Sequence, residues 1–302
     1  MTSDSTPGGY GPVLPRHVVL LFTLAMLWGT SFLVIKIGVG HMPALTLTAL
    51  RLATAAAVMV ALALAVRTPL PNGVRAWSFC FALAFFGNSL PFFLISWGEE
   101  GIQSGLAAIL MAVMPLTTLV LAHFLTEGDR LKPQKLVGVA LGFGGVVVLV
   151  GQAALEGLGG ALLHQLAVAG GAICYAVSVI ILKRMPPTPM VGRATLVLIF
   201  SVLQTAPAAL YFAGGVMPPF SFEALWPAIY LGVFPTAVAT LVLFKLASER
   251  EPSFIAFQNY LVPVFGVAWG AMLLDEVLSL KAIIALGLIL FGIFIANRRK
   301  VA

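Results

Sequence analysis

The chain has 302 residues, of which 60% are hydrophobic and only 9% are charged, and its mean hydropathy is +1.05. Because about a quarter of the residues in an ordinary soluble domain are charged, this composition excludes a water-soluble protein and predicts one that lies in lipid. The net charge of +6 could indicate nucleic-acid binding, but the lysines and arginines lie in short clusters at the ends of apolar runs and form no basic stripe. They are interpreted as topology signals.

Ten apolar segments follow one another along the chain, each near the roughly 20 residues that a membrane-spanning helix needs. Proline, glycine or charged residues separate them. They cover residues 18–39, 44–65, 76–97, 103–125, 134–151, 164–183, 193–213, 225–246, 253–274 and 281–297. The polar start of the chain lacks the h-region and cleavage site of a signal peptide, so the first span is expected to be retained.

The basic residues are shared unevenly between the two sides of this ten-span arrangement. Fourteen of the 17 lie on one side, only Lys281 lies on the other, and Lys36 and Arg51 fall inside spans. Because cytoplasmic connections retain positive charge, both termini are expected in the cytoplasm, with the chain crossing a bacterial inner membrane many times. The cytoplasmic tails are then residues 1–17 and 298–302.

The two halves of the sequence resemble each other. Ser104 to Val150 contains an apolar helix with a proline, an acidic turn and a Gly-rich helix, and Pro252 to Asn297 repeats that order. Each half, 18–151 and 164–297, holds five spans on either side of an extracytoplasmic linker at 152–163, and an odd number reverses the second half in the bilayer. Inverted repeats are typical of secondary transporters. The expected fold is an all-α integral membrane protein of ten transmembrane helices, in two inverted five-helix repeats around a central cavity.

Four segments carry a resemblance to a known family: LWGTSFLVIK at Leu27–Lys36, ALRLA at Ala49–Ala53, and the proline helices with acidic turns at Pro115–Leu131 and Pro263–Leu278. Together they resemble the drug/metabolite transporter superfamily, EamA-type, over nearly the whole chain, and in particular its bacterial exporters of aromatic amino acids. The resemblance implies efflux. The first acidic turn departs from the superfamily's usual Gly-Glu-Arg by reading Glu127-Gly128-Asp129-Arg130, so these turns indicate the fold and not the substrate.

Seven polar or aromatic side chains inside the predicted spans are candidates for binding a substrate. Polar groups within a bilayer need partners or water, so we expect these side chains to line a central cavity. The alternative is that they bond neighbouring helices, at about 0.6 kcal/mol each. The candidates are Trp28, Asn88, Tyr175, Gln204, Gln258, Asn259 and Tyr260.

A second group of residues lies toward the predicted extracytoplasmic side. The opposite charges of Lys36 and Arg51 on one hand, and of Glu99 and Glu100 on the other, predict an outer gate. Alternatively the basic side chains extend to the membrane interface, which is harder for Arg51 because it lies about two helical turns deep. Trp97 is a candidate for the same gate or for an interfacial aromatic belt.

All eleven acidic residues lie in tails, loops or the ends of spans. No carboxylate is therefore expected midway as a proton relay or sodium ligand, which predicts uncoupled facilitated diffusion by alternating access. The expected substrate is an amino acid, aromatic or otherwise apolar, or a related small metabolite, since aromatic faces can hold a cationic group without a carboxylate. A proton-coupled antiporter of drugs or aromatic cations is the alternative.

Two other classes compete with a carrier. An intramembrane enzyme needs acid/base pairs, metal ligands or an activated nucleophile, and none occurs at useful spacing; Cys80 and Cys174 have no partner at metal-ligand spacing. We therefore expect no enzyme, no metal and no cofactor. A passive channel is separated poorly from a carrier by sequence. The expected partners are a small-molecule substrate and the lipid bilayer, without nucleic acid; the oligomeric state stays open, and a monomer is compatible with the sequence.

Prolines occur inside several predicted spans. A proline removes a backbone hydrogen bond and favours a kink, so these positions are expected to interrupt their helices, either as hinges or as static kinks. They are Pro91, Pro115, Pro207, Pro235 and Pro263.

Overall fold

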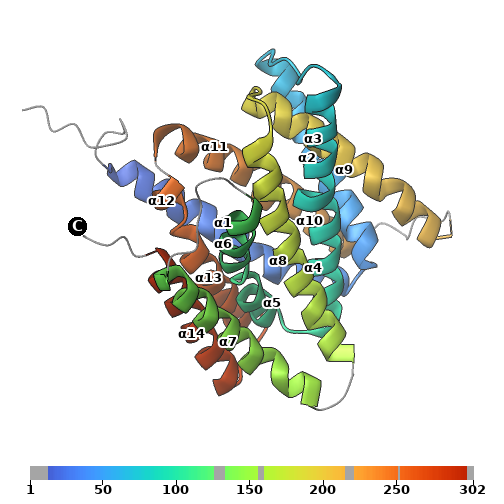
Figure 1. Cartoon of the computed structure of the whole chain (residues 1–302). Coiled ribbons are helices and arrows are strands. Elements are labelled where there is room, and N and C mark those ends of the chain that lie inside the picture. Colours follow the sequence, from blue (N-terminus) through green and yellow to red (C-terminus); the bar gives the residue numbers. More distant parts are fainter. Residues whose placement is uncertain (1–12, 126–132, 156–159, 215–220, 251, 298–302) are drawn as a thin grey trace, which may run out of the picture.

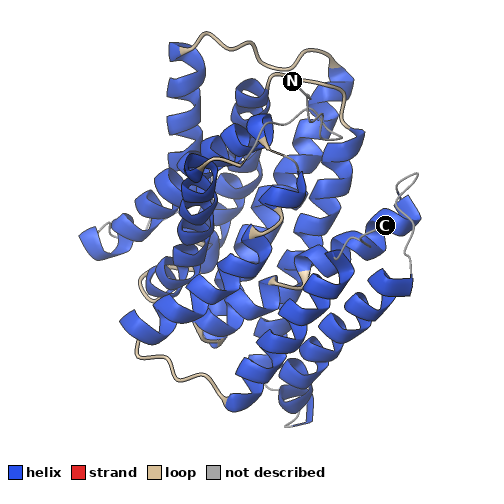
Figure 2. Cartoon of the chain, turned by 90° about the vertical axis from the view of Figure 1, so that its left-hand side faces the viewer, coloured by secondary structure: helices blue, strands red, loops and turns tan. Residues whose placement is uncertain are grey.

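The computed structural model describes residues 13–125, 133–155, 160–214, 221–250 and 252–297, and every regular element in those ranges is a helix (Figures 1 and 2). The elements in chain order are α1 (Pro15–Val39), α2 (Ala44–Ala65), α3 (Val74–Ala84), η1 (Phe85–Ser89), α4 (Leu90–Gly101), α5 (Ser104–Met111), α6 (Met114–Leu125), α7 (Pro133–Leu155), α8 (Gly160–Arg184), α9 (Met190–Phe212), α10 (Phe222–Gly232), η2 (Val233–Val238), α11 (Ala239–Glu249), α12 (Pro252–Ile255), α13 (Gln258–Leu273) and α14 (Leu280–Asn297). The all-α fold class predicted from composition is confirmed at this level.

Seven helical stretches of the described chain are long and apolar enough to cross a membrane, and each coincides with a predicted span. They are Pro15–Val39, Ala44–Ala65, Val74–Gly101, Ser104–Leu125, Ala161–Arg184, Met190–Phe212 and Phe222–Glu249. The other three predicted spans are occupied by α7, by α12 with α13, and by α14. The chain is therefore a multi-pass membrane protein, whereas the count of ten spans stays a prediction.

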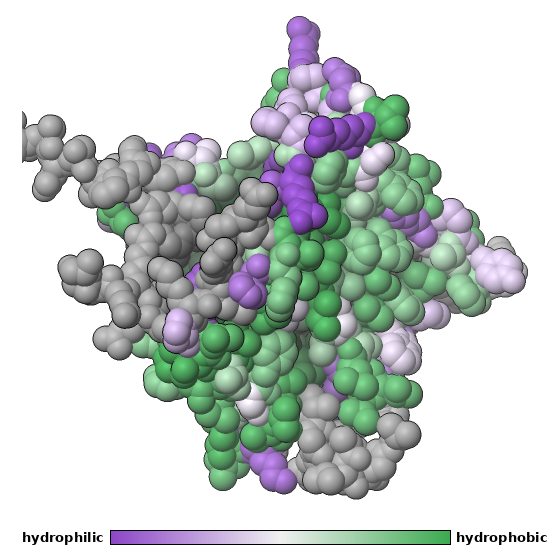
Figure 3. All heavy atoms as spheres, in the orientation of Figure 1, coloured by the Kyte–Doolittle hydropathy of each residue, from purple (hydrophilic) through white to green (hydrophobic). Residues whose placement is uncertain are grey.

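Large hydrophobic side chains cover the outside as well as the inside. Leu64, Phe124, Tyr211 and Phe212 are all more than 70% exposed, and the face in Figure 3 is mostly hydrophobic, with many of its hydrophilic residues at the upper end, near the α2–α3 connection. In water each buried Å² of such surface would be worth about 25 cal/mol, so exposing this much would favour aggregation. In lipid the same surface is the favoured one.

Two of the long stretches contain a π-helical turn near the middle. Val74–Gly101 contains η1, with Pro91 two residues beyond it, and Phe222–Glu249 contains η2, with Pro235 inside it. A proline lacks the N–H that an α-helix uses and its ring clashes with the preceding turn, which explains a wider turn at both places. These stretches are the third predicted spans of the two halves, so both halves carry the same irregularity.

The remaining prolines divide into two kinds. Pro115 lies at the start of α6, directly after the break that separates α6 from α5, as an interrupted helix requires. Pro207 and Pro263 lie inside α9 and α13, which continue through them, so the predicted kinks at those two positions stay a prediction. Membrane helices tolerate such prolines where neighbouring groups satisfy the freed backbone.

Several of the main helix pairs follow one pattern in both halves. Helix α1 packs against α13, α10 and α11, and its counterpart α8 packs against α6 and α4; the pairs α2 with α9 and α7 with α14 join equivalent helices. When each helix in these pairs is replaced by the helix five spans away in the other half, the same pairs result. Two structurally related halves would give this pattern. The closest approach in the pair of α7 and α14 depends on glycine, because a Cβ on Gly138 would lie 2.5 Å from the carbonyl oxygen of Gly292.

Four segments named in the sequence analysis lie partly or wholly outside the described residues. They are the acidic turn Glu127–Arg130, the tail 298–302, and most of the tail 1–17; the linker at 152–163 is described except for 156–159.

Candidate substrate cavity

A cavity of about 380 Å³ lies between helices of both halves. Its lining comes from α1, α2, α4, α5, α6, α8, α11 and α13, and from both π-helical turns. Small-molecule sites span about 300–1,000 Å³, so this volume suits a small metabolite. The helix irregularities meet here, since η1, η2, the break between α5 and α6 and the start of α13 all contribute lining residues.

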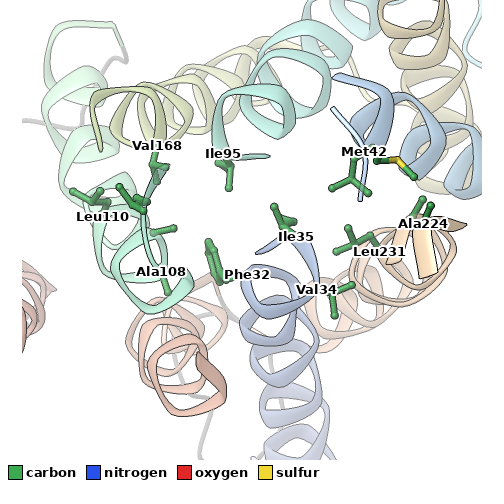
Figure 4. Packing of buried hydrophobic residues seen from close by; sticks show 14 residues of the cluster. Phe32, Val34, Ile35, Met42, Ile95, Ala108, Leu110, Val168, Ala224 and Leu231 are labelled. Atoms are coloured by element: carbon green, nitrogen blue, oxygen red, sulfur yellow. The ribbon is translucent and has the colours of Figure 1, made fainter. Parts of the chain in front are cut away.

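One end of the cavity is closed by apolar side chains. Figure 4 shows Phe32 and Ile35 of α1 gathered with Ile95 of α4 and Ala108 of α5. Each is at most 5% exposed, and each also lines the cavity. Lys36 follows Ile35 directly, and Glu99 lies about one helical turn beyond Ile95. The apolar layer therefore separates the cavity from the predicted outer gate.

Arg51 is the charged residue of the cavity lining, and it is only 6% exposed. Its Nε donates a hydrogen bond of 3.0 Å to Oγ1 of Thr236, and its guanidinium carbon lies 3.7 Å from the ring centre of Phe92, a cation–π contact. Thr236 donates its own proton to the carbonyl oxygen of Leu231 at 2.7 Å, so a lone pair of its oxygen is left for Arg51. The terminal nitrogens of Arg51 have no hydrogen-bond partner within the described residues.

The position of Arg51 depends on how the end of α10 approaches α2. A Cβ on Gly232 would lie 2.6 Å from the carbonyl oxygen of Arg51, so only glycine lets these two helices come so close. The π-helical turn that follows brings Thr236 opposite the guanidinium group. The sequence analysis did not identify Thr236 and Phe92 as site residues. Each of them directly follows the proline at one of the two π-helical turns.

Five of the seven predicted binding residues line the cavity, namely Trp28, Asn88, Tyr175, Gln258 and Asn259. The indole Nε1 of Trp28 donates to the carbonyl oxygen of Pro235 at 3.1 Å, and the side-chain Nδ2 of Asn88 donates to Oγ of Ser201 at 3.2 Å.

The other three lining side chains have unused hydrogen-bonding groups. Oε1 of Gln258 is buried without a partner in the described chain. Tyr175, whose ring lies 6.4 Å from that of Phe92, and Asn259 form no side-chain hydrogen bond there either. The cavity thus combines apolar walls with a few free polar groups, as small-molecule sites do.

Gln204 and Tyr260 lie outside the cavity lining. The side-chain Nε2 of Gln204 donates to the carbonyl oxygen of Phe81 at 3.1 Å, and its Oε1 accepts from Oγ of Ser89 at 2.7 Å. Gln204 therefore fastens α9 to η1 and α3, which is the helix-bonding alternative. Tyr260 packs against the hydrophobic cluster that contains Ile109.

Lys36 binds backbone groups rather than a carboxylate. Its Nζ donates to the carbonyl oxygens of Glu99 at 2.6 Å and Ile102 at 2.8 Å. The carbonyls at the end of a helix lack partners and carry partial negative charge, so an ammonium group satisfies them well. The expected ion pairs of Lys36 and Arg51 with Glu99 or Glu100 do not occur among the described residues.

Glu99 corrects an expectation about the acidic residues. It lies at the end of its span, as predicted, but it is 0% exposed, and neither carboxylate oxygen has a partner within the described chain. Lys36, Glu276 and Arg51 act on it electrostatically, and His164 lies against the neighbouring Gly101. The end of a span is not open to water here, because other helices cover it.

Trp97 and Glu100 are also outside the cavity lining. Trp97 is half-buried, with its ring 4.9 Å from that of His164. Oε1 of Glu100 accepts from the backbone N–H of Ala44 at 3.2 Å, at the start of α2. Of the four predicted gate residues, Arg51 thus lines the cavity, whereas Lys36, Trp97 and Glu99 lie beyond it.

The acidic turn of the second half has a structural role that the sequence did not reveal. The carboxylate of Glu276 accepts from the N–H of Ser104 at 2.7 Å, from Oγ of Ser104 at 3.0 Å and from the N–H of Gly105 at 2.9 Å. It caps the N-terminus of α5, where unpaired N–H groups attract an anion. Asp275, with φ of 52°, turns the chain so that Glu276 reaches this place.

The described residues contain no group of three or more His, Cys, Asp or Glu side chains that could hold a metal ion. Long apolar helices around a small, sparsely polar cavity are instead typical of a membrane protein that carries small molecules. The chain belongs to the EamA-like transporter family, whose model matches residues 16–151 and again residues 160–298.

Relatives cover nearly the whole chain. An uncharacterized transporter of Archaeoglobus fulgidus is 27% identical over 95% of this chain and all of its own length. A protein of Escherichia coli K12 named a probable amino-acid metabolite efflux pump is 28% identical over 92% of this chain and 93% of its own length. One solved crystal structure matches with a TM-score of 0.66 and 23% identity, covering 93% of this chain and 97% of that chain, and this likeness concerns the fold alone.

Proposed function

We propose that this protein exports amino acids, in particular aromatic or other apolar ones, or related small metabolites across a bacterial inner membrane. The observation that carries the proposal is the cavity of about 380 Å³ between the two halves, with its aromatic and apolar walls and few free polar groups. The name of the Escherichia coli relative, a probable amino-acid metabolite efflux pump, agrees with it.

Transport by alternating access follows from the arrangement proposed for the halves. Residues 18–151 and 164–297 act as inverted five-helix repeats with both termini in the cytoplasm, and the cavity lies where they meet. The symmetric pairing of helices and the double match to one family model support two related halves.

The proposed transport is uncoupled, because the described cavity lining contains no carboxylate that could exchange a proton against the substrate. Purified protein in liposomes, loaded with single amino acids, aromatic cations or sugar phosphates, tests this function directly. We expect saturable uptake and counterflow for apolar amino acids. Flux that does not saturate would indicate a channel and contradict the proposal.

The buried carboxyl of Glu99 favours proton-coupled antiport as a second candidate. With equal substrate concentrations on both sides and an imposed pH gradient, an uncoupled carrier accumulates nothing, in the wild type or in Glu99→Gln. Accumulation in the wild type that is lost in Glu99→Gln, while counterflow persists, would establish the antiporter and overturn uncoupled transport.

A further inference from the structure

The charge inventory of the cavity is one-sided. Among the 24 residues of the described lining, Arg51 is the one that carries a charge at neutral pH. A buried cation without a partner costs several kcal/mol, since it has lost its water. Glu99 acts on Arg51 electrostatically, but it lies outside the lining and forms no ion pair with it. The described lining of the cavity therefore has one positive charge and no negative one.

The guanidinium group of Arg51 is held so that one edge remains available. Phe92 covers a face of the group, and Thr236 accepts from Nε. The two terminal nitrogens have no hydrogen-bond partner in the described chain, and they are not fully buried. Because Arg51 lines the cavity, these nitrogens border it. Two parallel N–H donors on one edge of a rigid plane match the two oxygens of a carboxylate.

We propose that Arg51 binds the carboxylate of the substrate, so that the transported molecules are monocarboxylates with an apolar or aromatic body, α-amino acids among them. This inference rests on the proposed function and names the chemical group that the cavity selects. A single cation balances one negative charge, and the rest of the lining offers a dianion such as a sugar phosphate no second one.

The cavity lining also offers hydrogen-bond acceptors and aromatic rings for the amino group of an amino acid. Asn259, whose Oδ1 can only accept, and Tyr175 line the cavity, and neither side chain forms a hydrogen bond within the described chain. Trp28 and Tyr175 add aromatic surface that attracts a cation. Thr236 is a positioning residue in this arrangement, because it reaches the substrate through Arg51.

The test compares an amino acid with its amide, which differ only at the carboxyl group, and with the acid that lacks the amino group. Ligand-induced shifts in the thermal unfolding of the purified protein, titrated with L-phenylalanine, L-phenylalaninamide and 3-phenylpropanoate, give the affinity for each. We expect both carboxylates to bind the wild type and the amide to bind about tenfold or more weakly, since the amide cannot accept hydrogen bonds from Arg51 as a charged group. Leucine and leucinamide serve as a second pair.

Variants then assign the discrimination to Arg51. Arg51→Gln should bind acid and amide equally, Arg51→Lys should retain part of the preference, and Thr236→Val should reduce it less than Arg51→Gln does. Arg75→Gln, the same substitution at an exposed position near the start of α3, is the matched control and should keep the full preference.

The outcomes separate the two proposals. Equal affinity of the wild type for acid and amide, or a preference that survives in Arg51→Gln, overturns carboxylate binding by Arg51 while amino-acid transport still stands. Failure of every acid to bind, together with counterflow of an aromatic cation such as ethidium, overturns the proposed function as well. If Arg51→Gln does not fold, the wild-type comparison and Arg51→Lys still decide.

Discussion

The two ends of the helix bundle use charged side chains in different ways. At the end where α1 and α4 finish, Lys36 and Glu276 bind backbone groups beneath other helices, and Glu99 is buried without a partner. At the end where α1 begins, Glu249 pairs with Arg16 at 3.7 Å, with His17 at 3.2 Å and with Lys245 at 2.7 Å.

Exposure to solvent determines how much each of these contacts stabilises the folded protein. The side chains of Arg16 and Lys245 are more than 60% exposed, so water and salt weaken their pairing with Glu249. Lys36 and Glu276 instead bind backbone groups that are shielded from water. If either side chain is removed, water cannot take its place, and those backbone groups lose their hydrogen-bond partner. The first end is therefore expected to be the firmly closed one, and the proposed alternating access would need the larger free energy to open it.

Removing Glu276 should have the largest effect. Glu276→Ala leaves two backbone N–H groups at the start of α5 without a partner, and we expect the free energy of unfolding to fall by about 2–4 kcal/mol. Chemical unfolding in detergent measures it. Glu100→Ala is the matched control, since the exposed residue Glu100 makes a single 3.2 Å bond, to the N–H of Ala44; an equal loss in both variants would refute the role of burial.

Removing the Lys36 ammonium should have an intermediate effect, about 1–3 kcal/mol, because two carbonyl oxygens lose a charged donor. Lys36→Gln should also open this end more often. A cysteine placed at Ile95, in a background with Cys80 and Cys174 replaced by serine, should then react faster with a membrane-impermeant maleimide. Unchanged reactivity relative to the parent would show that Lys36 does not hold this end closed.

Removing Glu249 should have the smallest effect. Glu249→Gln is expected to lower the free energy of unfolding less than the two substitutions above, and the difference from wild type should shrink as salt is added. The salt dependence of unfolding checks this. A loss as large as that of Glu276→Ala, persisting at high salt, would contradict the contrast between the two ends.

Much of the fold follows from hydropathy alone, because a spanning helix must be apolar over its whole length. All ten predicted ranges are mainly helical where the chain is described, with short breaks at 112–113 and 256–257, and five of the seven predicted binding residues reach the cavity. What hydropathy cannot give is the direction in which a side chain points. Gln204 is a polar residue near the middle of its span, like those that line the cavity. Its side chain nevertheless points away from the cavity and binds α3 and η1.

Two further features depend on contacts between distant parts of the chain. Glu99 is at a span end by sequence, and only the helices packed around it make it a buried carboxyl. Lys36 can reach a carboxylate as easily as a carbonyl, and the choice depends on how α4 ends beside it. The partner of Glu276 is 171 residues away along the chain at Gly105, so no local pattern announces it.

The two π-helical turns also set the rotational register of the cavity walls. Because a π-turn holds one residue more than an α-turn, deleting one residue from η1 would restore an α-helix and rotate all of the following α4 by about 100°. Phe92 and Ile95 would then leave the cavity, as Thr240 and Leu243 would after the same deletion in η2. The one additional residue in each π-helical turn therefore determines which side chains of α4 and α11 line the cavity.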